Sequence, residues 1–240
     1  MSAALSHGGN VLTMHGFTLF DWLALAVFAA CWLGYATVVD RIPRIRERSV
    51  IAAMDEHRRR WTRAMLERDN RIADIAAIGN LMNSTSFLAT TSIFILGGLV
   101  ALLGAPDLGQ RVVGALPYAE PSTVVGWEVK IALLLLIFIN AFFELTWALR
   151  QFNYTSILVG GLPFGAPTDP GIQQAGAAAL VLNRAAQHFN TGLRSYYFGL
   201  AALAWIIHPL ALVATSLFVL RELHRREFRS AVREALTTSG

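Results

Sequence analysis

The chain has 240 residues, of which 55% are hydrophobic and 15% are charged, and its formal net charge is +4. A soluble domain of this size needs about 25% charged residues to cover its surface. The composition therefore nearly excludes a soluble enzyme and indicates a membrane protein.

Four apolar stretches are long enough to cross a bilayer, because about 20 residues at 1.5 Å per residue span a hydrocarbon core of roughly 30 Å. We predict transmembrane helices over residues 19–39, 82–103, 131–149 and 196–220. No Lys or Arg precedes the first stretch, so it lacks the basic region of a cleavable signal peptide and is expected to remain in the protein. The expected fold is all-α, a polytopic membrane protein that forms one domain over residues 1–240.

Residues 44–80, between the first two predicted spans, are expected to form a long amphipathic helix. Its apolar residues recur at helical spacings, and they are Ile51, Met54, Trp61, Met65, Ile72 and Ile75. As one helix this segment would reach roughly 55 Å, which is too long for the end of a four-helix bundle. We expect it either to break in two or to pack on another subunit. A juxtamembrane helix with a solvated charged face is an equally good interpretation.

The distribution of Arg predicts the orientation. Residues 40–82 contain ten Arg and seven acids, and basic loops stay in the cytoplasm. We therefore expect a multi-pass protein of the inner membrane with this loop inside and the N-terminus outside. The modest net charge of the loop disfavours nucleic-acid binding and leaves an anionic leaflet as the better partner for its Arg residues.

The C-terminal tail conflicts with this orientation. Four spans place both termini outside, yet five Arg follow the last span, namely Arg221, Arg225, Arg226, Arg229 and Arg233. Either the tail lies on the outer surface, or residues 156–163 form a fifth, re-entrant segment that is too short to span. We favour four spans, because the first loop has the larger excess of positive charge.

Polar residues inside the apolar stretches are candidate site residues, since a polar side chain in a bilayer must be paired or hydrated. Asn140 and Glu144 share one helix face, with an interfacial pair between Glu144 and Arg150 as the alternative for the acid. His208 precedes Pro209, which is expected to kink the last span and leave a polar lining there.

The second predicted span is rich in small polar side chains. They are Asn83, Ser84, Thr85, Ser86, Thr90, Thr91 and Ser92, and they precede Gly97 and Gly98. Such residues let helices approach closely, and a pore lining is the alternative role.

Several runs resemble the DUF599 family. They are residues 183–198 (NRAAQHFNTGLRSYYF) with Trp205 and Pro209, residues 68–74, residues 86–91 with Gly97 and Gly98, and residues 150–154. The resemblance covers most of the chain and implies a multi-pass membrane protein. The family has no established activity, so the resemblance implies no site residues.

The longest of these runs places Arg184, His188, Asn190 and Arg194 at the entrance of the last predicted span. Arg184 and His188 share a helix face and could hold a phosphate or carboxylate by charge-assisted hydrogen bonds. A belt of interfacial Tyr and Arg side chains is the alternative. No nearby His or carboxylate completes a metal site, so we expect no metal and no cofactor.

Two functions fit these observations. The first is a homo-oligomeric channel or transporter for a small ion or solute, with the hydroxyls of the second span or the Asn140 and Glu144 pair facing the path. The alternative is a non-catalytic scaffold or accessory subunit that binds a partner complex through its Arg-rich helical loop. An enzyme is not expected, because no catalytic group stands at a recognisable spacing.

Overall fold

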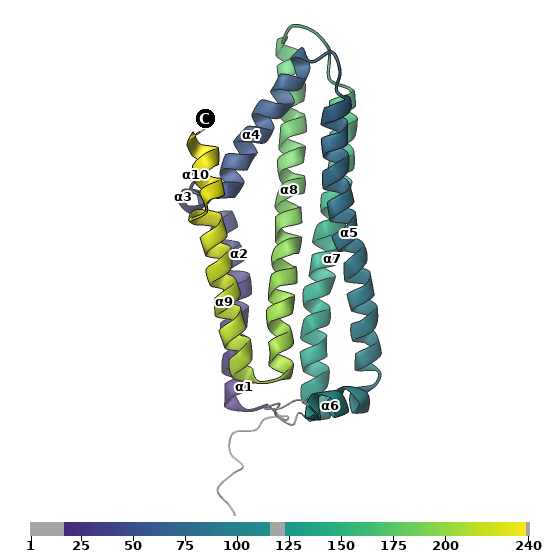
Figure 1. The fold of residues 1–240 in the computed structure, drawn as a ribbon, viewed down its shortest axis with the longest axis vertical. Helices are drawn as coiled ribbons and strands as arrows, with labels where there is room; N and C mark the ends of the chain where they lie inside the picture. The colour runs from purple at the N-terminus through teal and green to yellow at the C-terminus, as the bar shows by residue number, and fades with distance from the viewer. Residues whose placement is uncertain (1–16, 116–122, 239–240) are drawn as a thin grey trace, which may run out of the picture.

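A computed structural model describes residues 17–115 and 123–238 of the chain, and Figure 1 shows their arrangement. The regular elements within these two ranges are all helical, which confirms the all-α expectation. Long, nearly parallel helices stand side by side, and the short α6 (Pro106–Gly114) lies across their lower end in Figure 1.

Three segments are long and apolar enough to cross a membrane: Leu19–Val39, Ile72–Leu103 and Val124–Gly160. The first comprises α1 (Leu19–Ala29), a π-helical turn (Ala30–Gly34) and most of α2 (Tyr35–Arg41). The other two are α5 and α7, which extend beyond the predicted spans 82–103 and 131–149. Both helices continue past the apolar stretch through polar residues, so hydropathy alone underestimates the length of α5 and α7.

The long loop helix breaks in two, which was one of the two expected outcomes. After the short α3 (Pro43–Arg46), α4 covers Val50–Ala64, and a 3₁₀ turn at Met65–Glu67 separates it from α5. Met65 and Leu66, which belong to this turn, are buried. The Arg71 guanidinium fixes the break by donating to the carbonyl oxygens of Met65 (2.9 Å), Leu162 (2.7 Å) and Pro163 (2.8 Å).

Residues 196–220 do not form the single helix that the sequence predicted. α8 covers Asp169–Leu203, a 3₁₀ turn follows at Ala204–Ile206, and α9 covers Pro209–Phe228. Figure 1 shows α9 running back beside α8. His208 has an extended backbone, and its Nδ1 accepts a hydrogen bond from the Leu210 N–H at 3.0 Å. Pro209 therefore begins a helix, where its missing N–H leaves no hydrogen bond unmade.

The reversal at His208 brings the Arg-rich tail back to the Arg-rich loop. The Ile51 N–H donates to Glu227 at 3.0 Å, and His57 Nε2 lies 3.3 Å from the Leu236 carbonyl oxygen of α10 (Ala231–Thr238). Residues 156–163 hold no separate re-entrant segment, because α7 continues to Gly160. The tail and the loop thus lie at the same end of the molecule, whereas four spans would have placed them at opposite ends.

α7 and α8 pack through buried residues that recur at seven-residue intervals. Those of α8 are small, namely Ala178, Ala185, Gly192 and Gly199, and those of α7 are larger, namely Phe138, Leu145, Phe152 and Val159. A seven-residue repeat of this kind keeps one seam between two helices in contact along their length. A Cβ added at Gly192 would lie 2.7 Å from Leu145 Cγ, so no larger residue fits there without movement.

Candidate functional site

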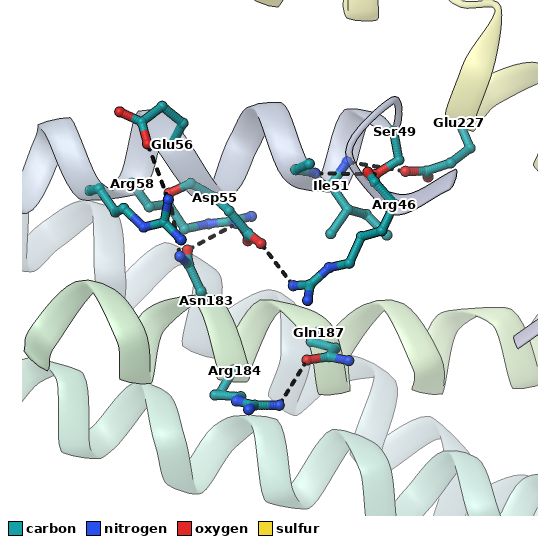
Figure 2. Close-up of polar contacts among 12 residues, drawn as sticks. Arg46, Ser49, Ile51, Asp55, Glu56, Arg58, Asn183, Arg184, Gln187 and Glu227 are labelled. Atoms are coloured by element: carbon teal, nitrogen blue, oxygen red, sulfur yellow. Dashed lines mark hydrogen bonds and ion pairs between the residues drawn. The ribbon is translucent and has the colours of Figure 1, made fainter. Parts of the chain in front are cut away.

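The polar residues of α8 attach this helix to three others, beginning with α4. Asn183 Oδ1 accepts a hydrogen bond from Arg58 Nη1 at 3.4 Å, and its Nδ2 donates to the Asp55 carbonyl oxygen at 3.3 Å (Figure 2). The Asp55 carboxylate also pairs with Arg46 (3.0 Å) and Arg58 (3.1 Å). Burial lowers the pKa of the Arg58 guanidinium, and the negative charge of Asp55 opposes this shift. The cluster therefore connects α3 to α4 through Arg46 and Asp55, and Arg58 and Asn183 connect α4 to α8.

His188 attaches α8 to α7. Its Nδ1 lies 2.7 Å from Glu144 Oε2, and about a third of the His side chain and a quarter of the Glu side chain are exposed (31% and 26%). The alternative pair between Glu144 and Arg150 does not form, because Arg150 donates to the Tyr154 hydroxyl at 2.6 Å and lies over the Trp147 ring. Glu144 and His188 thus satisfy each other at the edge of the α7–α8 seam.

Two further contacts lie deeper along α8. Asn140 Nδ2 donates to Ser195 Oγ at 2.9 Å, which joins α7 to α8. The hydroxyls of Ser92 and Tyr196 lie 2.8 Å apart, and both are within hydrogen-bonding distance of the Leu88 carbonyl oxygen on α5. Hydrogen bonds of this kind hold apolar helices in register, since no water competes for them in a bilayer.

The other predicted site residues do not converge with these. Arg184 is exposed on α8, and its Nη1 donates to Gln187 Oε1 at 3.4 Å (Figure 2). His188 instead contacts Glu144, so Arg184 and His188 have separate partners. Arg194 is buried, with Nε donating to the Asn190 carbonyl oxygen at 3.4 Å. His208 caps α9 at the far end of α8. The seven predicted residues therefore belong to several separate contacts.

Asn190 lines a hollow of about 430 Å³ between α4, α5, α7 and α8. Its lining includes the aromatic side chains of Trp61, Phe152 and Phe189 and the basic side chain of Arg58. Trp61 is fixed by its Nε1–H, which donates to Asp74 Oδ1 at 2.7 Å, and Asp74 also pairs with Arg68. Sequence reasoning missed this contact, although an indole N–H on the buried side of a helix needs an acceptor.

The outward face of α5 carries polar groups of a different kind. Asn83, Ser86 and Thr90 are exposed, and within the described residues their side chains make no hydrogen bond. Gly97 and Gly98 continue this face, and a Cβ added at either would meet nothing within 4 Å. The opposite face of α5, which includes Thr85 and Ser92, is the buried one.

Among the described residues, no group of three or more His, Cys, Asp or Glu side chains is placed to hold a metal ion. A family model described as "Protein of unknown function, DUF599" matches residues 23–232, which confirms the resemblance seen in the sequence. The match extends from α1 to the first residues of α10 and includes the contacts of α8 with α4, α5 and α7. No curated protein and no solved structure matches the chain.

Proposed function

The chain belongs to the DUF599 family, whose function is unknown, and from the geometry of this member we propose that it is a homo-oligomeric channel or transporter-like protein of the inner membrane for a small ion or solute. The observation that carries the proposal is the outward face of α5. No catalytic role is part of it.

In the membrane we place five crossings, formed by α1 with α2, and by α5, α7, α8 and α9. The N-terminus is outside, and the Arg-rich end formed by α4 and α10 is cytoplasmic. An odd number of crossings puts both Arg-rich segments on the side that the positive-inside rule favours. The packing of the tail against α4 supports this arrangement.

α5 is the least enclosed of the three membrane-length segments. Only 17% of its apolar window is buried, compared with 22% for Leu19–Val39 and 39% for α7. Thr90 lies thirteen residues before Leu103, which is roughly 20 Å along the helix and close to the middle of a bilayer. Lipid offers no hydrogen bond to the Thr90 hydroxyl, and Ser86 and Asn83 continue the same face toward the cytoplasmic edge of the hydrocarbon core. This face is therefore suited to water or to another helix.

A second copy of α5 supplies the neighbouring helix, and a water-filled path between the two copies supplies the water. Gly97 and Gly98 allow two helices to approach closely, and hydroxyl and amide groups can line a path for an ion without the desolvation of a formal charge. Asn140 and Glu144, the other polar residues proposed for a path, are already bonded to Ser195 and His188. The path therefore lies between copies rather than inside one.

The test uses full-length protein purified in mild detergent and reconstituted into liposomes. We expect a native mass of more than one chain and flux of at least one small ion or solute across the liposome membrane. Thr90→Val should change that flux at least severalfold. Thr91→Val is the matched control, because the Thr91 hydroxyl already donates to the Phe87 carbonyl oxygen at 2.8 Å. A monomeric mass without any flux would overturn the proposal.

A scaffold or accessory subunit is the second candidate, and one observation favours it. Ile72, Ile75 and Ile157 are exposed by 73%, 46% and 73% at the Arg-rich end, beyond the part of α5 and α7 that we place in lipid. The apolar side of the loop helix is not free for a partner, because Trp61 and Met65 pack within the chain. A specific partner recovered with the wild type but lost with Ile157→Asp would favour the scaffold. Equal recovery with both would count against it.

A further inference from the structure

A second hollow, of about 490 Å³, lies where α2, α3, α9 and α10 meet. Figure 1 shows these four helices gathered at the same end of the molecule, beside α4. Its apolar lining includes Tyr35, Val38 and Val39 of α2, Ile45 of α3 and Phe228 of α9. The hollow therefore offers an apolar surface directly at the end of the first membrane-length segment.

The polar lining of this hollow is basic. Arg44, Arg48, His224 and Arg233 contribute to it, and its described lining includes no acidic side chain. The nearby Glu227 is engaged elsewhere, since its carboxylate accepts the Ile51 N–H (Figure 2). No other described lining residue therefore neutralises the positive charge of Arg44 and Arg48.

Arg44 and Arg48 differ from most other Arg residues at this end of the molecule. Arg46 and Arg58 pair with Asp55, and Arg59 and Arg60 pair with Glu56. By contrast, the guanidinium groups of Arg44 and Arg48 make no hydrogen bond or ion pair within the part of the chain that the structure describes. Their donors are thus available to a ligand.

The position of the hollow identifies the ligand. The apolar segment Leu19–Val39 ends here, and the apolar first half of α9 gives way to Arg221 and its basic neighbours at the same level. A bilayer that covers these segments places its cytoplasmic headgroups beside α3. A guanidinium group binds phosphate oxygens through two parallel hydrogen bonds, and basic residues at this depth attract anionic lipids.

We propose that this hollow binds the phosphate headgroup of an anionic phospholipid of the cytoplasmic leaflet, with Arg44 and Arg48 on the phosphate and Val38 and Phe228 against the acyl chain. The site needs both parts, because a free phosphate would leave the apolar surface uncovered. A zwitterionic lipid would bring an ammonium group among the Arg side chains.

The test measures binding of fluorescent phosphatidylglycerol to the full-length protein in neutral detergent, with fluorescent phosphatidylcholine and inorganic phosphate as the comparison ligands. Phosphatidylglycerol should bind at least about tenfold more tightly than phosphatidylcholine, since each Arg near the headgroup adds to the attraction. The double variant R44Q/R48Q should weaken phosphatidylglycerol binding by about tenfold.

R59Q/R60Q is the matched control, because it removes the same charge from the outer face of α4, where both side chains pair with Glu56. This control should change the affinity by less than about twofold. V38W fills the apolar part of the hollow without changing its charge, and it should also weaken binding. If R44Q/R48Q does not fold, V38W decides the question alone.

Three outcomes would overturn the proposal. If R59Q/R60Q weakened phosphatidylglycerol binding as much as R44Q/R48Q does, the lipid would be attracted by surface charge in general and not bound in the hollow. If phosphatidylcholine bound as tightly as phosphatidylglycerol, the hollow would not select lipids by the net negative charge of the headgroup. Inorganic phosphate that binds as tightly as the lipid would make the site one for a soluble anion.

Discussion

Small residues occupy two helix faces of this molecule in opposite environments. Gly192 and Gly199 of α8 lie against α7, where an added Cβ would come within 2.7 Å and 2.8 Å of Leu145 and Phe138. Gly97 and Gly98 of α5 face open space. The polar residues differ in the same way, since Asn140 bonds to Ser195 while Asn83 has no partner among the described residues. The α8 face packs against α7. The α5 face has the composition of a helix interface, but within the described residues no helix packs against it.

Valine substitutions at the glycines are expected to give the largest difference in unfolding free energy between the two faces. Gly192→Val should lower the free energy of unfolding by about 3 kcal/mol, because its side chain overlaps Leu145 in a seam that leaves little room to adjust. In the isolated protomer, Gly98→Val should change it by less than about 0.5 kcal/mol, because a Cβ there meets nothing within the chain. Denaturant unfolding in detergent checks both values. Equal destabilisation by the two variants would refute the contrast.

The two asparagines give the next largest difference. Asn140→Ala removes the hydrogen bond to Ser195, which is buried, and should cost about 1 kcal/mol of unfolding free energy. Asn83→Ala serves as its control and should be nearly neutral in the isolated protomer, because no contact within the described chain is lost. The same unfolding assay applies, and a neutral Asn140→Ala would show that this bond does not hold α7 to α8.

The Glu144–His188 pair should contribute the least. A double-mutant cycle with alanine at both positions is expected to give a coupling of about 0.5 kcal/mol, since both side chains are partly exposed to solvent. A parallel cycle between Glu144 and Arg150 should give no coupling. The reverse result would restore the pair that the sequence offered as the alternative.

Hydropathy predicted the three membrane-length segments because each is a long apolar run, but it could not detect the reversal at His208. Residues 196–220 are apolar on both sides of that point, and Pro209 inside an apolar run is equally compatible with a kink. The break before α5 had a local signal that went unused. The side chain of Asn70 accepts the Ile72 N–H at 2.8 Å, as Asn residues do at turns and helix starts.

For the site residues, the sequence could predict only which residues share a helix face. The i,i+4 spacing of Asn140 and Glu144 correctly placed both on one side of α7. Their partners Ser195 and His188 lie 55 and 44 residues away, and nothing local encodes those distances. Arg184 and His188 also share a face by spacing, yet Glu144 takes His188 because α7 lies beside it. A pattern within one helix shows which residues point together but not what they meet.

Cysteine cross-linking in native membranes tests directly whether α5 faces a second copy. In a Cys31→Ser background, Thr90→Cys should form a disulfide-linked dimer on mild oxidation. Leu136→Cys is the control, because Leu136 is exposed on α7 (58%) at a similar distance from the outer end of its helix. Dimer from Thr90→Cys alone is the predicted result. Monomer from Thr90→Cys, or equal cross-linking of both variants, would contradict the α5 interface.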